Sequence, residues 1–219
     1  TADDQSAMLV LGASITKRLD ATWGVGSGQG GLDTGVIANT TYHVFAIRRP
    51  DTGVVDVLLS ASATSPTMPA NYTQKKRVGS ICRIAGAIKG FRQVGDMFRW
   101  GNAVVDRNDT AAFASALLTL TIPLGIAVQP IIAFNLQVGP SDDCTLSLGD
   151  AVTAAADIDV LQGQTTAADG TDANRGVVPP VFTSNTSAQI YFKQINTAGA
   201  PTTSWVVTLG WIDRRGQDD

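Results

Sequence analysis

"IAVQPIIAFNLQV", residues 126–138, decides the fold class because its apolar side chains recur at every second position. Ile132 and Phe134 fall on one face of an extended chain. Asn135 and Gln137 fall on the opposite face. A period of two is typical of a β-strand that buries one face in a core. This stretch therefore predicts a long strand.

Pro130 interrupts this pattern near its start, and a proline nitrogen cannot donate a hydrogen bond to a neighbouring strand. The sequence therefore places the strand at a sheet edge or puts a bulge at Pro130. Other stretches with apolar alternation predict further strands, separated by clusters of Gly, Pro, Asn and Ser. These strands are expected at residues 42–48, 54–60, 77–84, 117–122, 144–148, 189–195 and 204–212.

The composition also favours strands joined by turns. All 19 acidic residues are Asp, and the chain has 22 Gly and 24 Thr. Asp prefers caps and turns, whereas the missing Glu is a good helix former. We therefore predict an all-β fold, an antiparallel, jelly-roll-like β-sandwich with at most one or two short helices. The two segments that could be helical are 15–23 and the Ala-rich 109–118.

The 219 residues suit one large β domain. We expect residues 1–24 to be an N-terminal strand or docking segment. Residues 25–219 are then expected to form a single β-sandwich domain, with a weak subdivision near 101–110. No apolar stretch is long enough to predict a membrane span.

The net charge of −3 combines a mildly basic first half with an acidic second half. The longest basic run is Lys75-Lys76-Arg77, which is short for a nucleic-acid surface. We therefore expect neither nucleic-acid binding nor membrane insertion.

Two Asp-Thr-Gly tripeptides raise the question of an aspartic protease, which uses two carboxylates sharing one proton. Asp33 follows a glycine-rich stretch, and Asp51 follows a proline. Only 18 residues separate them, too few for two protease lobes. Instead, "RPDTGVV" is typical of a hairpin loop in which Gly53 takes a positive φ. Both tripeptides are predicted to be turns.

The remaining reactive side chains form no recognisable catalytic or metal motif. Cys82 and Cys144 each have apolar neighbours, so two buried thiols are favoured over a disulfide. His43 is the only histidine and lies inside a predicted strand. The acidic stretches 141–160 and 169–176 offer oxygen ligands, but without the spacing of a calcium loop. We predict no catalytic residue, no metal site and no cofactor.

Aromatic residues supply the candidate ligand-binding positions. Trp23 and Trp100 adjoin glycine-rich turns, and Tyr72 lies in a proline-rich loop. An aromatic surface with a polar edge can stack against a sugar ring, so these three are the predicted ligand-binding residues, with burial in the core as the alternative for each. Trp205 and Trp211 share one face of the predicted strand 204–212 and are expected in a core or subunit interface.

A longer pattern carries a family resemblance. It runs through "GLDTGVIANTTYHVFAIRRPDTGVVDVLLSASATSPTMPANYTQKKRVGSI", continues to "GFRQVGDMFRW" and closes at "GWIDRRG". This pattern resembles a segment of tailed-bacteriophage and prophage virion proteins of the tail-fibre, head-fibre or spike type. The resemblance covers residues 30–100 and a short motif at 205–216. Residues 101–204 match only in general strand character.

The resemblance implies a β-rich virion protein, trimeric, that contacts the host surface, and it carries over no catalytic residue. The leading hypothesis is a non-enzymatic fibre or spike whose loops bind a host-surface glycan. The second hypothesis is a purely architectural decoration or collar protein that binds other virion proteins. The third, less favoured, is a polysaccharide depolymerase. All three place the protein on the virion.

Overall fold

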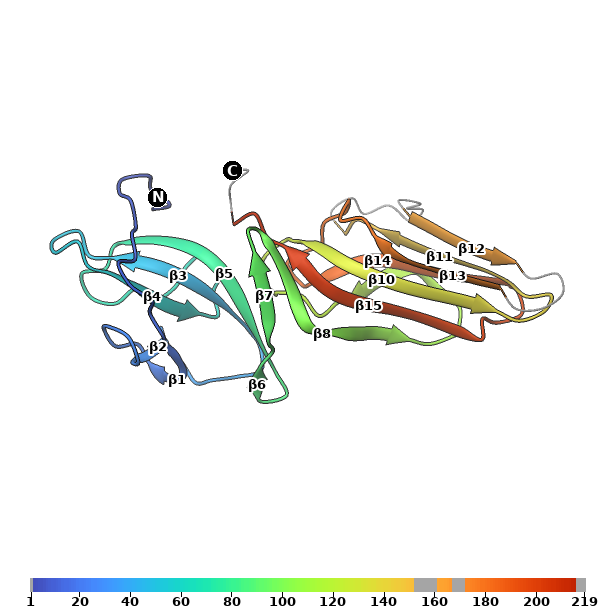
Figure 1. The fold of residues 1–219 in the computed structure, drawn as a ribbon, viewed down its shortest axis with the longest axis horizontal. Helices are drawn as coiled ribbons and strands as arrows, with labels where there is room; N and C mark the ends of the chain where they lie inside the picture. The colour runs from blue at the N-terminus through green and yellow to red at the C-terminus, as the bar shows by residue number, and fades with distance from the viewer. Residues whose placement is uncertain (1, 152–160, 167–171, 216–219) are drawn as a thin grey trace. The chain divides into compact units, whose positions relative to one another are not determined.

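The computed structural model describes residues 2–151, 161–166 and 172–215 (Figure 1). All regular secondary structure in these ranges is β-strand, which confirms the all-β prediction. The chain forms two compact units. The first comprises Thr1–Lys89 together with Arg215, and the second comprises Gly90–Arg214. None of the described residues belongs to a helix long and apolar enough to cross a membrane.

The first unit contains one six-stranded sheet with the order β1-β2-β4-β3-β5-β6. β1 pairs with β2 and β2 with β4 in parallel, whereas the other neighbours are antiparallel. The central strands bury Phe45, Ile47 and Leu58 against Tyr72. The strands are β1 (Arg18–Thr22), β2 (Gly30–Leu32), β3 (Thr41–Arg48), β4 (Val55–Ser60), β5 (Gln74–Ile84) and β6 (Ala87–Ile88).

The second unit contains two sheets, one of five strands and one of four (Figure 1). The five-stranded sheet has the order β13-β10-β15-β8-β7, and the four-stranded sheet has the order β12-β11-β14-β9. The strands of the first are β7 (Phe91–Val94), β8 (Met97–Asn108), β10 (Gln129–Val138), β13 (Asp172–Val178) and β15 (Thr203–Ile212). Those of the second are β9 (Phe113–Thr119), β11 (Asp143–Gly149), β12 (Leu161–Thr166) and β14 (Gln189–Ala198).

Buried polar contacts join these two sheets into a sandwich. The Arg107 guanidinium of β8 lies 4.9 Å from the ring centre of Phe192 on β14. Ser204 Oγ of β15 donates a hydrogen bond of 2.7 Å to Gln194 Oε1 of β14. Because both contacts are buried, they identify the inward faces of the two sheets.

A bulge lies next to Pro130, although its additional residue is on the neighbouring strand β15 and not at Pro130 itself. β10 pairs with β15 so that Ile131 lies opposite Gly210 and Ile132 lies opposite Thr208, which leaves Leu209 as the additional residue. A bulge reverses the alternation of side chains along the strand. Trp211 is therefore turned to the buried side of the sheet, away from the face that carries Trp205, and the prediction that both tryptophans share a face is wrong.

Both helical predictions are wrong as well. Part of 15–23 forms β1, and part of 109–118 forms β9. Asp109 does not cap a helix but accepts a hydrogen bond from the Ala111 backbone. β9 then pairs with β14, and Phe113 packs edge-on against Phe192. Pairing and core contacts therefore outweigh the helical preference of the alanines.

The domain organisation differs from the predicted one. The division falls between residues 89 and 90, whereas the sequence suggested one domain over 25–219 with a weak subdivision near 101–110. Residues 97–108 form the single strand β8, so no boundary falls there. Residues 1–24 contain β1, and Asp3 forms ion pairs of 3.4 Å with Lys75 and Lys76 of β5. Much of this segment is thus part of the first unit.

Candidate functional site

A glycine-rich loop between β1 and β2 is held by a network of polar contacts in the first unit. The loop covers residues 23–29, and Gly26 and Gly28 have positive φ values of 92° and 79°. Such backbone angles favour glycine, because a Cβ would clash there. The loop therefore bends tightly over the end of β1.

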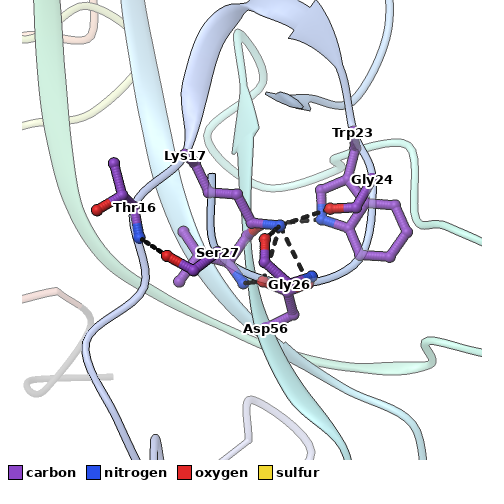
Figure 2. A network of polar contacts seen from close by, with 8 residues as sticks. Thr16, Lys17, Trp23, Gly24, Gly26, Ser27 and Asp56 are labelled. Atoms are coloured by element: carbon purple, nitrogen blue, oxygen red, sulfur yellow. Dashed lines mark hydrogen bonds and ion pairs between the residues drawn. The ribbon is translucent and has the colours of Figure 1, made fainter. Parts of the chain in front are cut away.

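Lys17, immediately before β1, extends its ammonium group to this loop and to Asp56 (Figure 2). Its ammonium group lies 2.9 Å from a carboxylate oxygen of Asp56 on β4. It also donates to the carbonyls of Gly24 at 2.6 Å and Gly26 at 2.9 Å. Three acceptors match the three N–H bonds of an ammonium group. All three donors of Lys17 are therefore satisfied, although its side chain is only 3% exposed and that of Asp56 only 1%.

Asp56 also binds the loop directly, and we call the pair Lys17 and Asp56 the clamp. Its carboxylate accepts hydrogen bonds from the backbone of Gly26 at 2.8 Å and of Val57 at 2.7 Å. In a further contact, the Thr16 backbone N–H donates a hydrogen bond of 3.0 Å to Ser27 Oγ (Figure 2). These contacts fix the loop to β4, and its residues 25–29 remain exposed. These hydrogen bonds restrain the loop against the sheet.

Trp23 stands at the root of the loop and is half-buried. Its indole nitrogen donates to the Val57 carbonyl at 3.0 Å, and Lys17 Nζ lies 5.2 Å from its ring centre. Its ring meets that of Tyr72 edge-on at 5.1 Å. A partly exposed indole at the root of a loop that also exposes Ser27 and Gln29 offers both an aromatic surface and hydrogen-bonding groups, the two features that sugar-binding surfaces combine.

The other two predicted ligand-binding residues are largely covered. Tyr72 is 4% exposed, and burial raises the pKa of its hydroxyl, with a further contribution from the charge of Asp56. Trp100 belongs to the second unit and is 6% exposed. Its indole donates to the Thr121 carbonyl, and its ring packs against Trp211. The structure thus brings Trp23 and Tyr72 together, and of the three only Trp23 is partly exposed.

The two Asp-Thr-Gly tripeptides are turns, as predicted. Gly53 has a φ of 74° in the loop between β3 and β4, and Asp51 pairs with Arg49 at 2.6 Å. That pairing lowers the pKa of Asp51. Asp33 accepts hydrogen bonds from the backbones of Thr34 and Thr67. Each carboxylate therefore stabilises a local turn or joins two loops.

His43 and the two cysteines are buried. His43 Nδ1 lies 2.9 Å from Ser80 Oγ across β3 and β5. Cys82 and Cys144 are free thiols in different units, which confirms the preference for thiols over a disulfide. Burial raises the pKa of both thiols, so neither is an activated nucleophile.

The second unit has a cavity of about 220 Å³ at the start of β10 and the end of β15. Its polar lining comes from Gln129, Thr183 and Arg214. Among the described residues, no group of three or more His, Cys or Asp side chains is placed to hold a metal ion. The acidic stretches 141–160 and 169–176 lie partly outside the described residues.

Sequence reasoning missed the clamp, because Lys17 and Asp56 are 39 positions apart. One local signal was available. Asp56 is the only charged residue in the apolar strand "VVDVLLS", and a buried carboxylate requires a partner. Comparisons with protein-family models, curated proteins and solved structures found no match to this chain.

Proposed function

We propose that this protein is a virion-associated structural and attachment protein of a phage or phage-like particle, and that its first unit presents a loop to a host-surface glycan. The observation that carries the proposal is the clamped loop at residues 23–29. Lys17 and Asp56 hold it in place from inside the unit, while residues 25–29 face solvent beside Trp23.

The clamp matters for recognition because ordering a mobile loop on binding costs free energy. A loop already fixed to its sheet avoids most of that cost. Its exposed Gln29 amide and Ser27 hydroxyl can form hydrogen bonds with a sugar, and the partly exposed Trp23 ring at its root can add stacking surface. The resemblance to virion proteins over residues 30–100 supports the same role, since it includes β2, β3, β4 and β5 of this unit.

The test measures binding of the labelled protein to an array of bacterial polysaccharides and to a panel of whole bacteria. Gln29→Ala and Val25→Asp, both at the exposed loop, should weaken binding at least tenfold. Thr52→Ala in the exposed β3–β4 turn is the matched control and should leave binding unchanged. If the unmodified protein binds no glycan and no cell, or if the control weakens binding equally, the attachment role is refuted.

A second candidate function, architectural docking to another virion protein, is favoured by one observation. Residues 8–11 expose apolar side chains, with Met8 71% exposed and Val10 61% exposed. Met8→Asp together with Val10→Asp should abolish incorporation into particles, with glycan binding intact, if this segment docks. These substitutions are preferable to deleting residues 1–24, because that deletion would remove Lys17 and β1.

A further inference from the structure

The outward face of the five-stranded sheet carries an apolar surface that the proposed glycan site does not use. On β15, the residues that point into the sandwich are Ser204, which contacts β14, and the fully buried Val206 and Thr208. Side chains alternate along a strand. Trp205 and Val207 therefore point away from the sandwich core.

The strand register aligns apolar residues into a row across this face. Val207 of β15 pairs with Ala133 of β10 on one side and with Val105 of β8 on the other. Ala133 pairs in turn with Val177 of β13. The row thus crosses four strands, and its two ends, Val105 and Val177, are 57% and 61% exposed.

A second apolar row lies further along the same strands. Ile212 of β15 pairs with Met97 of β8, and Met97 pairs with Val94 of β7, which is 53% exposed. Isolated exposed apolar residues are normal on protein surfaces, but a contiguous patch on one sheet face marks an interaction surface. We call the outward face of β13, β10, β15, β8 and β7 the apolar face.

The charges of the apolar face have the arrangement of an interface. The outward positions of its two central strands, β10 and β15, carry no charged residue. Outward arginines occur on the other three strands: Arg175 on β13, Arg92 on β7, and Arg99 on β8, where it lies between the two apolar rows. The centre of a protein–protein interface is typically depleted in charged residues, as β10 and β15 are.

The size of the apolar face fits a second copy of this chain. Four strands spaced about 4.8 Å apart give a width of about 19 Å, and the ten residues of β15 give a length of about 33 Å. Each copy would bury about 600 Å², or about 1,200 Å² in total, which is the lower end of stable interfaces. The apolar centre is also typical of interfaces between identical subunits. We infer that this face packs against the sheet of another copy of the chain.

The test is the molar mass of the full chain in solution, measured by light scattering during gel filtration from 1 to 200 µM. The unmodified protein should form a homo-oligomer. The double variant Val105→Asp with Val177→Asp should raise its dissociation constant at least 100-fold, because carboxylates at both ends of the row would be buried. Both positions are exposed within one chain, so the variant should fold, as circular dichroism would verify.

Val36→Asp is the matched control, since Val36 is an equally apolar and 88% exposed valine of the first unit. It should leave the molar mass unchanged. An unmodified protein that stays monomeric at 200 µM would overturn the inference. An oligomer unaffected by the double variant, or equally dissociated by the control, would overturn it too. None of these results depends on glycan binding, so this inference and the attachment role fail separately.

Discussion

Replacing Lys17 by Met removes the cation from the clamp and keeps the length of the side chain. The buried Asp56 carboxylate then loses its counter-ion, and the Gly24 and Gly26 carbonyls lose their donor. Breaking a buried ion pair by removing one partner costs about 3–5 kcal/mol. Because small domains are stable by only about 5–15 kcal/mol, the first unit should lose a large share of its stability.

The assay is urea unfolding followed by amide hydrogen exchange of β3 and β4, which reports on the first unit alone. With an m value of about 1–3 kcal/mol/M, the urea midpoint of this unit should fall by about 1 M or more. The second unit supplies an internal control, since its exchange should not change.

The double variant Lys17→Met with Asp56→Leu replaces both charges with apolar groups. Its loss of unfolding free energy should be smaller than the sum of the losses in the two single variants, and the difference should be at least about 1 kcal/mol. The reason is that the double variant leaves neither charge buried without its partner. The reasoning is refuted if Lys17→Met costs under about 1 kcal/mol, or if the two single effects simply add.

Three further predictions concern other buried contacts. Gly30→Ala would place a Cβ 2.0 Å from the Thr22 carbonyl oxygen, so it should force β1 and β2 apart and destabilise the first unit by about 1–3 kcal/mol in urea unfolding. Arg107→Met should destabilise the second unit by about 3 kcal/mol in the same assay, because the guanidinium donates to two backbone carbonyls. Cys82 and Cys144 should react slowly with a thiol reagent at pH 8, since burial raises both pKa values.

Each of these has a control. Gly12→Ala should be neutral, because nothing lies within 4 Å of its Cβ. Arg107→Lys should recover only part of the loss, since one ammonium cannot reproduce the guanidinium fork. In denaturant both thiols should react fully. The stability that the buried, protonated thiols contribute is complete below the ordinary thiol pKa and is lost as the pH rises through the raised pKa. A urea midpoint that increases with pH in this range would contradict the raised pKa values.

The long strands could be predicted because their signal is local. The alternation in residues 126–138 and 204–212 corresponds to β10 and β15, two neighbours in one sheet. The bulge at Leu209 could not be located on β15, because it depends on the pairing with β10. The glycines at residues 24–31 indicate a loop. They do not indicate that Lys17 and Asp56 bind it.

The errors have a shared physical cause. The Ala-rich 109–118 has helical propensity, yet partners far along the chain made it a strand: Gln194 donates to the Thr110 carbonyl, and β9 pairs with β14. Trp100 looked like a surface residue beside a glycine, yet Trp211, which lies 111 positions away, buries its ring. Local sequence carries no record of such distant partners.

The second unit begins on β7 and ends on β15, two strands of one sheet that are separated only by β8. Phe91 lies at its start and Trp211 near its end, and their rings are 5.9 Å apart. β8 joins the strands that carry them, β7 and β15. A module whose entry and exit are adjacent can be cut out or replaced without stretching the remaining chain. Residues 90–214 could therefore be exchanged as one cassette, so that the chain gains a new sandwich while the loop-bearing unit keeps its sequence.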